Sequence, residues 1–322
     1  MKKIKVGIMG YGNLGKGLVS ALQATPDMEL IKVFTRRDPK SFQHPFMEAA
    51  GQIMDYKDKL DVLILALGSA TDIPQMAPEL ATHFNLVDTY DNHQRIPEYY
   101  DTLAAKAKPH QKTAMIGMGW DPGLFSLNRL LSECVLPHGK TFTFWGKGVS
   151  QGHSDALKRI KGVKYAVQYT VPKQHILDQI EKQDTTLQGF QTHDRQCFVV
   201  TKPGFDKSAI EDQIIHMENY FKEYDTEVNF ISEEDFKKNH QEMFHGGHVI
   251  RVGETGEKNQ SKIDFSLTLK SNPEFTARVA VMGARAVYKM NQLENYGVIT
   301  ILDTPAAFYS ALPLKELIKN YL

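Results

Sequence analysis

Three glycines between a β-branched run and a helix-like segment form a pattern that could hold phosphate groups. Gly10, Gly12 and Gly15 follow the run 4–9 and precede the segment 16–23. In such a turn the first glycine permits a tight bend, the second lets a pyrophosphate approach the backbone, and the third lets helix and strand pack closely. A glycine-rich turn without a ligand is the alternative, and the flanking strand and helix disfavour it, because the helix N-terminus offers free N–H groups to phosphates. We expect a dinucleotide to bind at Gly10, Tyr11, Gly12, Asn13, Leu14 and Gly15.

The end of the second β-branched run, 30–34, predicts which dinucleotide binds. A domain that binds NAD places an acidic residue here, against the ribose hydroxyls. This chain has Thr35, Arg36 and Arg37 instead. Cations and hydroxyl donors suit a 2′-phosphate, which a carboxylate would repel. The expected cofactor is therefore NADP(H); the alternative is that the two arginines only solvate a surface loop.

A third strand-like run, 62–67, ends in small and hydroxyl-bearing residues that suit the edge of a cofactor crevice. Ser69 and Thr71 could equally cap the helix that starts near residue 73. The segment is Gly68, Ser69, Ala70, Thr71 and Asp72, of which the last four are expected cofactor contacts.

Two aspartates follow further strands of the same half of the chain. Asp91 comes after the run 85–88, and Asp121 comes after the run 113–118. Either loop could approach the nicotinamide end of the cofactor, where a carboxylate can relay a proton. For Asp121 a structural role is also open, because an aspartate before a proline is a common start of a helix.

The elements that must position these residues divide the chain in two. Up to about residue 118, short apolar runs alternate with amphipathic segments, which is typical of a parallel sheet covered on both faces. After residue 120 longer, more polar strands appear, and the alternation in 261–270 favours an antiparallel sheet with one wet face. A strong helix is predicted over 274–290, and a short strand and a helix over 298–322.

The predicted fold class is α/β: an N-terminal Rossmann dinucleotide-binding domain with a mixed α+β second domain. The expected domains are 1–120 for NADP binding and 121–296 for the mixed α+β part. The C-terminal segment 297–322 is expected to return to the first domain.

Composition excludes several classes of partner. Lysine plus arginine and aspartate plus glutamate both number 38, so no net field attracts nucleic acid or an anionic membrane. No apolar run approaches the ~20 residues that span a bilayer, and no signal peptide is recognisable. We expect a soluble cytoplasmic protein. Cys134 and Cys197 are too few for a disulfide framework and are expected to be small buried residues.

Two histidine motifs suggest other chemistry, which the sequence disfavours. His245 and His248 have a spacing that would allow two metal ligands, but no third ligand belongs to a recognisable set and no metal is expected. His153 lies close to Ser154 and Asp155, yet no serine nucleophile elbow accompanies it, so hydrolysis is rejected.

Several unusual strings make the prediction more specific. They are GYGNLG at 10–15, TRRD at 35–38, GSATDIP at 68–74, VDTYDNH at 87–93, GWDPG at 119–123, FWGKGVSQGHSDAL at 144–157, AVQYTVP at 166–172, QTHDRQCFVV at 191–200, MFHGGHVI at 243–250 and NPEFTA at 272–277. In order and spacing the chain resembles the meso-diaminopimelate D-dehydrogenase family from end to end. The resemblance implies reversible, NADP-dependent oxidative deamination of the D-centre of meso-2,6-diaminoheptanedioate in lysine biosynthesis. The implied products are L-2-amino-6-oxoheptanedioate, ammonia and NADPH. The implied assembly is a homodimer, with 121–296 as the substrate-binding and dimerisation domain.

The resemblance also implies roles for individual residues. Asp91 and Asp121 would hold the ammonium of the D-centre, with Asp121 favoured as the proton relay, and both would also contact the cofactor together with Asn92 and Trp120. The distal L-centre would be bound by Thr170, Arg195, His245 and Asn272. The middle of the pocket would be formed by Trp145, Gln151, Gly152 and Asp155.

Two other functions stay open at this point. One is another two-domain NADP-dependent reductase, acting on a semialdehyde or a cyclic imine. The other is a sensor that binds NADP(H) without turnover, which the paired aspartates and the residues around Arg195 disfavour, because a sensor needs no second charged pocket.

Overall fold

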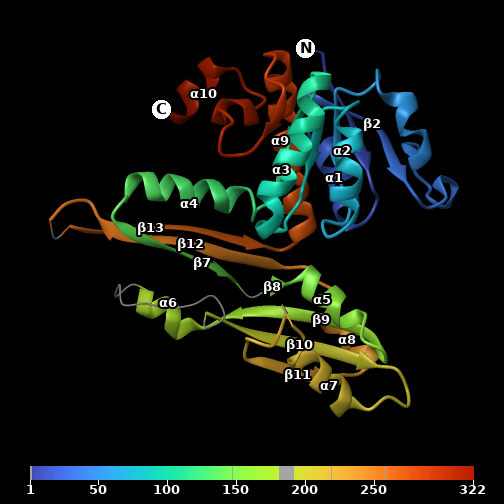
Figure 1. Ribbon diagram of the computed structural model, residues 1–322, viewed down its shortest axis with the longest axis vertical. Helices are drawn as coiled ribbons and strands as arrows, with labels where there is room; N and C mark the ends of the chain where they lie inside the picture. The colour runs from blue at the N-terminus through green and yellow to red at the C-terminus, as the bar shows by residue number, and fades with distance from the viewer. Residues whose placement is uncertain (1, 147, 181–191, 219, 258) are drawn as a thin grey trace. The chain divides into compact units, whose positions relative to one another are not determined.

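The computed structural model describes residues 2–146, 148–180, 192–218, 220–257 and 259–322 (Figure 1). The chain divides into two compact units. The first consists of Met1–Leu127 and Pro273–Leu322, and the second of Asn128–Asn272. The expected boundaries at 120 and 296 therefore differ from the observed ones, most of all at the second boundary.

The first unit contains a sheet of seven strands in the order β14-β6-β5-β4-β1-β2-β3. Every neighbouring pair in this sheet is parallel. The order runs outward in both directions from β1 and β4, which is the arrangement of a Rossmann fold. The strands are β1 (Ile4–Met9), β2 (Met28–Thr35), β3 (Met47–Ala49), β4 (Val62–Leu65), β5 (Leu86–Asp88), β6 (Thr113–Met115) and β14 (Gly297–Ile299).

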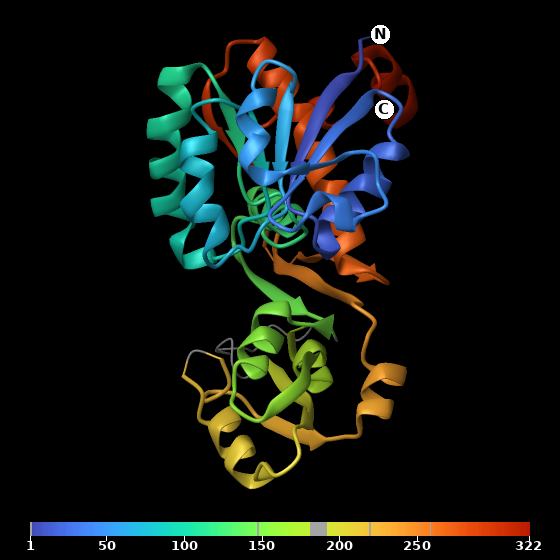
Figure 2. The same ribbon diagram turned by 90° about the vertical axis from the view of Figure 1, so that its right-hand side faces the viewer.

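Helices cover both faces of this sheet (Figure 2). One face packs against α1 (Asn13–Gln23) and α9 (Asn272–Gln292). The other packs against α2 (Asp72–Leu80) and α3 (Ile96–Ala107). Burial on both faces explains why the strands are continuous apolar runs, as in β4, where all residues are buried. The expected parallel sheet is confirmed.

Helix α9 is the reason for the different domain boundary. Its apolar positions Val279, Ala280 and Val287 belong to the same core as the residues of α1 and β1. Sequence periodicity predicted a helix with a buried face, but periodicity does not say which sheet that face covers.

An ion pair ties α9 to the turn before β2. Arg285 Nε lies 2.6 Å from Asp27 Oδ2, and Arg285 Nη2 donates to Asp27 Oδ1 over 2.8 Å. The same guanidinium donates through Nη1 to the backbone oxygen of Tyr309 over 2.7 Å. One buried side chain therefore joins α9, the N-terminal half of the chain and the segment before α10 (Leu314–Tyr321).

The second unit contains two smaller sheets. One has the order β11-β10-β9-β8 and the other the order β13-β12-β7. Their strands are β7 (Gly139–Trp145), β8 (Gly148–Val149), β9 (Val163–Pro172), β10 (His193–Thr201), β11 (Thr226–Phe230), β12 (His245–Glu254) and β13 (Gln260–Leu269). The helices are α4 (Leu124–Val135), which crosses the unit boundary, α5 (Gln151–Lys158), α6 (Gln174–Ile180), α7 (Lys207–Ile215) and α8 (Glu233–Asn239).

The antiparallel pairing expected from the alternation in 261–270 is confirmed, since β13 pairs antiparallel with β12. The other sheet of this unit is mixed. β10 and β11 run parallel, with Arg195 opposite Thr226. The reason is the crossover connection between them, which carries α7 and returns the chain to the same end of the sheet.

The two cysteines differ in exposure. Cys197 is buried as expected, whereas Cys134 is exposed, so the expectation for Cys134 is wrong. Cys134 lies on the face of α4 that also exposes Leu131 and Val135. Of the helices described, none is both long enough and apolar enough to cross a bilayer.

Candidate active site

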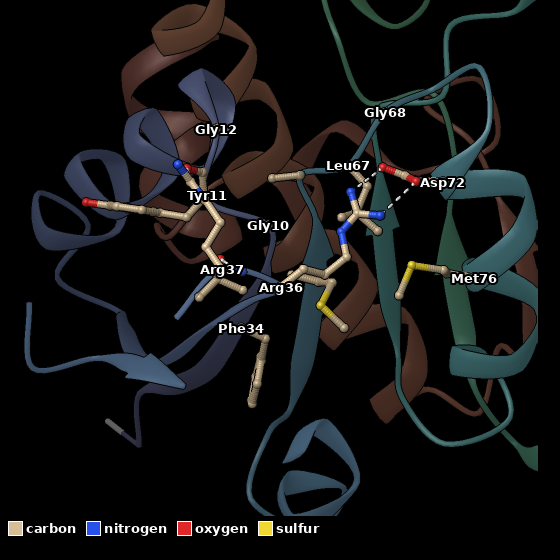
Figure 3. Close-up of a pocket in the computed structure, with 13 residues that line it drawn as sticks. Gly10, Tyr11, Gly12, Phe34, Arg36, Arg37, Leu67, Gly68, Asp72 and Met76 are labelled. Carbon is tan, nitrogen blue, oxygen red and sulfur yellow. Dashed lines mark hydrogen bonds and ion pairs between the residues drawn. The ribbon is translucent and has the colours of Figure 1, made fainter. Parts of the chain in front are cut away.

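A cavity of about 320 Å³ lies at the carboxyl ends of β1, β2 and β4 (Figure 3). In an open parallel sheet, ligands bind in the crevice outside these ends, where the strand order reverses. The cavity is lined by Met9, Gly10, Tyr11, Gly12, Phe34, Thr35, Arg36, Arg37, Ala66, Leu67, Gly68, Asp72 and Met76.

The glycines of the first turn have separate roles. Gly10 has a φ of +105°, and a Cβ there would lie 2.2 Å from the backbone oxygen of Ala66. A Cβ at Gly15 would lie 2.3 Å from the oxygen of Gly10, so close packing requires both glycines. A Cβ at Gly12, in contrast, would meet nothing within 4 Å. Gly12 is the N-cap of α1 and has no side chain to cover the free N–H groups, which leaves room for a phosphate there.

Arg37 is held in place by its neighbours. Its Nη2 donates to the backbone oxygen of Tyr11, and its guanidinium carbon lies 4.7 Å from the centre of the Phe42 ring. Its backbone N–H donates to Thr35 Oγ1 over 3.2 Å. An exposed cation with a fixed side chain loses little conformational entropy when it binds an anion, so this corner is preorganised for a phosphate.

Arg36 points toward the other side of the cavity and pairs with Asp72 (Figure 3). Two N–H···O bonds join them, from Nη1 to Oδ1 at 3.2 Å and from Nη2 to Oδ2 at 2.8 Å. Asp72 lies in the first turn of α2, where a negative charge is favourable. Together with the open backbone at Gly12, the two arginines and Thr35 fit a dinucleotide that carries an additional phosphate on its adenosine ribose.

The cavity brings together only some of the expected cofactor residues. It unites Gly10, Tyr11, Gly12, Thr35, Arg36, Arg37 and Asp72. Its lining does not include Asn13, Leu14, Gly15, Ser69, Ala70, Thr71, Asp91, Asn92, Trp120 and Asp121. The residues that complete the lining were not expected as cofactor contacts; they are Met9, Phe34, Ala66, Leu67, Gly68 and Met76. Most of these are apolar, and the signal that could have found them is their position at strand ends or, for Met76, one helical turn after Asp72.

Asp88 connects the two loops that carry the candidate catalytic aspartates. It is fully buried at the end of β5, and its Oδ1 accepts from the backbone N–H groups of Tyr90 and Gly117, both at 3.0 Å. Its Oδ2 accepts from Tyr99 Oη at 2.6 Å. Burial raises the pKa of Asp88, while these three hydrogen bonds oppose the rise. The loops that begin after β5 and β6 are therefore fixed to one carboxyl group.

Asp91 and Asp121 lie on these two loops. The backbone N–H of Asp91 donates to Ser69 Oγ over 2.9 Å, which ties the loop after β5 to the loop after β4. Asp121 is partly buried, and α4 begins three residues later, at Leu124. Trp120 is buried and its ring packs edge-on against Phe125, with the centroids 5.2 Å apart.

In the second unit, Arg195 and Thr170 form a buried donor pair. They lie opposite each other on β10 and β9, and Arg195 Nη1 donates to Thr170 Oγ1 over 2.6 Å. The guanidinium carbon lies 3.9 Å from the centre of the Tyr224 ring, which supports it from one side. Arg195 is buried, and this burial lowers its pKa from the usual value. Arg195 Nε is buried without a hydrogen-bond partner.

His245 lies close to this pair, and the backbone of Asn272 is bonded to the strand-entry segment just before His245. Gly148 pairs with Thr170, and a Cβ at Gly148 would lie 2.5 Å from the His245 ring. The backbone N–H of Asn272 donates to the oxygen of Met243 over 2.8 Å. Burial lowers the pKa of His245, so at neutral pH the imidazole is uncharged and carries one N–H donor.

For the residues expected in the middle of the substrate pocket, the structure shows the position in the fold but few side-chain contacts. Trp145 ends β7, and Gln151 and Gly152 begin α5, but their side-chain positions lie outside the described part of the structure. Asp155 is on α5, and its Oδ1 lies 3.0 Å from Lys158 Nζ.

The histidines that suggested other chemistry have structural partners. His153 Nδ1 lies 2.7 Å from Ser150 Oγ, and its ring packs edge-on against Tyr220 and Phe221. Burial, followed by the charge of Arg195, lowers the pKa of His153 to about 4. His248 Nδ1 lies 3.0 Å from Asp264 Oδ1. No group of three or more His, Cys, Asp or Glu side chains in the described segments is arranged to hold a metal ion.

Comparison with known proteins identifies the family. The diaminopimelic acid dehydrogenase C-terminal domain matches residues 119–271. The chain is 50% identical to a meso-diaminopimelate D-dehydrogenase of Ureibacillus thermosphaericus, with 100% of both proteins covered. The structure of Corynebacterium glutamicum DAP dehydrogenase in complex with DAP matches with a TM-score of 0.95 and 41% identity, and covers 100% of both chains. An engineered D-amino acid dehydrogenase bound to NADP+ matches with a TM-score of 0.91 and 40% identity, again with 100% of both chains covered. The chain therefore belongs to the meso-diaminopimelate D-dehydrogenase family.

Proposed function

We propose that the protein catalyses the reversible, NADP-dependent oxidative deamination of the D-centre of meso-2,6-diaminoheptanedioate. The products are L-2-amino-6-oxoheptanedioate, ammonia and NADPH. The observation that supports this proposal is that two separate groups of cations and hydroxyl donors are held in place: the arginines at the end of β2, and the buried pair of Arg195 with Thr170. The first suits a phosphorylated cofactor and the second suits a substrate carboxylate.

The cofactor site is the cavity at the ends of β1, β2 and β4. NADP+, when bound, supplies the acceptor for the hydride. The backbone around Gly12 and the start of α1 would hold the pyrophosphate, and Thr35, Arg36 and Arg37 would hold the 2′-phosphate. Gly15 acts indirectly, because it allows α1 to pack against the turn.

Asp91 and Asp121 would bind the ammonium of the D-centre. Their loops follow adjacent strands and are both fixed by Asp88. Two carboxylates at this point attract an ammonium, and one of them, with Asp121 favoured, takes a proton as the C–N bond becomes an imine. Water then adds to the imine carbon and ammonia leaves.

The distal L-centre would be bound by the residues around Arg195. The guanidinium, the Thr170 hydroxyl and a neutral His245 are all donors, and Asn272 completes the set. Donors at this end and carboxylates at the other would reject a reversed substrate, because its carboxylate would face two aspartates. This accounts for reaction at one centre only. Trp145, Gln151, Gly152 and Asp155 would form the middle of the pocket.

Three further parts of the proposal concern context. We propose that the reaction serves lysine and diaminopimelate biosynthesis, that the protein is cytoplasmic, and that it works as a homodimer through the second unit. Sedimentation analysis of the purified protein would test the dimer, and a mass of one chain would reject it.

The decisive experiment is an NADP+ reduction assay with the meso, LL and DD isomers of 2,6-diaminoheptanedioate and several simple D-amino acids. The meso isomer should react well and the others poorly, and NAD+ should replace NADP+ poorly. Aspartate semialdehyde and dihydrodipicolinate serve as controls with NADPH. Turnover of either control, or NADP(H) binding without turnover of any diamino acid, would reject the proposed reaction.

A further inference from the structure

Gln168 lies beside the anion site of the second unit without being one of its expected residues. It precedes Thr170 by two positions on β9, so both side chains lie on the same face of the sheet. Arg195 is directly opposite Thr170, and Cys197 is directly opposite Gln168. Gln168, Thr170 and Arg195 therefore form a continuous polar group on one face of two adjacent strands.

The backbone around Gln168 is fixed from the side of α5. Its N–H donates to Ser154 Oγ over 3.0 Å, and its carbonyl oxygen accepts from the Ser150 N–H over 3.1 Å. The side chain is 0% exposed. Its position is therefore set by the fold and does not depend on contacts with bulk water.

Only one of the two polar atoms of the Gln168 amide has a hydrogen-bond partner in the protein. Nε2 donates to Thr170 Oγ1 over 3.5 Å, whereas Oε1 is buried without a hydrogen-bond partner. A buried acceptor without a partner is destabilising, and such groups in native proteins call for an explanation. Cys197 on the facing strand is a neutral thiol, since burial raises its pKa to about 12.

The unpartnered atoms of this group are complementary to the two charges of an α-amino acid. Arg195 Nε is a donor without a partner, and the Thr170 hydroxyl, which accepts from Arg195 and Gln168, keeps its own proton to donate. Both suit a carboxylate. Gln168 Oε1 is an acceptor on the same face and suits an ammonium. An α-amino acid carries both charges on one carbon, so its partners must come from neighbouring residues of one face, and Gln168, Thr170 and Arg195 are such neighbours.

We propose that Gln168 Oε1 accepts a hydrogen bond from the α-ammonium of the distal L-centre and so determines the configuration that the enzyme accepts there. The inference rests on the proposed function. The carboxylate on Arg195 and Thr170, the ammonium on Gln168 and the chain that leads to the D-centre would fix three of the four groups on the distal α-carbon. A centre of the opposite configuration, as in the DD isomer, could not keep all three contacts at once. Gln168 is thus a specificity-determining residue, distinct from the carboxylate-binding pair.

The test is Gln168→Met, which keeps the length of the side chain and removes both polar atoms. Three substrates are compared: the meso isomer, the DD isomer, and D-2-aminoheptanedioate, which keeps the distal carboxylate but lacks the distal ammonium. The variant should lose about tenfold to a hundredfold in kcat/KM on the meso isomer, the value of a hydrogen bond to a charged group. On D-2-aminoheptanedioate it should stay within about twofold of wild type. The preference for meso over DD should fall by the same factor as the meso activity.

The matched control is Gln196→Met. Gln196 is on the adjacent strand but faces outward, where its Nε2 donates to Glu227 Oε2 over 3.2 Å. This variant should keep wild-type values on all three substrates. Melting temperature gives an independent measurement, because Met at position 168 removes an unpartnered buried oxygen and should leave the melting temperature equal or higher. A residue with only a structural role would lower it.

Two outcomes would overturn the inference: equal losses on the meso substrate and D-2-aminoheptanedioate, or no loss on either. If Gln168→Met does not fold, Gln168→Asn withdraws the oxygen by one methylene and should give the same pattern. A wild-type protein without turnover would reject the proposed function. Calorimetric titration of the meso isomer into wild type and variant would then still decide whether Gln168 contributes to binding.

Discussion

Arg36 and Asp72 are joined by two hydrogen bonds across the cofactor cavity, at 2.8 and 3.2 Å. The Arg36 side chain is 67% exposed and that of Asp72 is 24% exposed. Exposed ion pairs contribute about 0–1 kcal/mol, so this pair opens at little cost. A 2′-phosphate carries more charge than Asp72 and can compete for the same guanidinium. In the proposed cofactor site, Asp72 would therefore hold Arg36 near the 2′-phosphate without blocking it.

Arg37 is the cation that we expect to matter most for cofactor choice, because its side chain is already fixed by Tyr11 and Phe42. Arg37→Ala should raise KM for NADP+ about tenfold to a hundredfold, the value of a charge-assisted hydrogen bond. KM for NAD+, which has no 2′-phosphate, should change little. Lys40→Ala, which removes an exposed cation nearby, is the control and should change neither constant. Equal losses with both coenzymes would contradict the assignment of a 2′-phosphate site.

Asp72→Asn tests the electrostatic part of the same site. Removing one negative charge beside the phosphate should tighten NADP+ binding roughly threefold at low salt. The gain should shrink as ionic strength rises, because the site is partly exposed. Fluorescence titration with NADPH at two salt concentrations measures both effects. Weaker binding in this variant would mean that the orientation of Arg36 by Asp72 outweighs the repulsion.

Tyr99→Phe tests whether the buried carboxyl of Asp88 positions the catalytic loops. The substitution removes the 2.6 Å hydrogen bond to Asp88 Oδ2 and leaves that oxygen without its donor. We expect kcat to fall roughly tenfold, because small displacements of catalytic groups are costly. NADPH binding should be unchanged, since neither residue lines the cofactor cavity. Tyr100→Phe on the same helix is the control. A lower melting temperature with an unchanged kcat would limit Asp88 to a structural role.

Arg195→Met tests the carboxylate site of the second unit. Activity on the meso isomer should fall at least a hundredfold, because the distal carboxylate loses a buried, charged donor. Simple D-amino acids, which have no distal carboxylate, should be accepted relatively better than by wild type. Steady-state kinetics on the meso isomer and on D-alanine give the ratio. An unchanged selectivity would remove Arg195 from the substrate site.

Local patterns predicted the parts of the site that depend on backbone shape and on charge at strand ends. Gly10 and Gly15 were predicted because only glycine fits where their Cβ atoms would collide with backbone. Arg36 and Arg37 were predicted because their position after the second strand has a fixed meaning in this fold. Ser69, in contrast, binds the backbone of Asp91 and is not part of the cavity lining.

Other features depend on tertiary contacts that no local pattern contains. Asp88 and Asp91 are similar in sequence context, yet one is fully buried and the other exposed. Gln168 looks like any polar residue of a strand, and only the pairing with the facing strand shows that it shares a face with Thr170 and Arg195. The unit to which α9 belongs is likewise decided by packing, with Gly17 allowing α1 to approach Pro273 and Ala277 closely.

The ion pair between Asp27 and Arg285 gives a prediction about pH and stability. The hydrogen bond from Arg285 lowers the pKa of Asp27 below 3.8. A carboxyl whose pKa is lower in the folded than in the unfolded state stabilises the fold above the unfolded value, and this contribution is lost as pH falls through the folded value. Asp27→Asn should therefore cost about 3 kcal/mol at pH 7, because it leaves a buried guanidinium without its counter-charge. Thermal denaturation should show a lower melting temperature for the variant at pH 7 than for wild type. This difference in melting temperature should shrink as pH falls below 3.8.

The control is Glu29→Gln, which changes an exposed acid on β2 and should leave the melting temperature at its wild-type value. A difference between wild type and Asp27→Asn that stays constant at all pH values would contradict the proposed linkage.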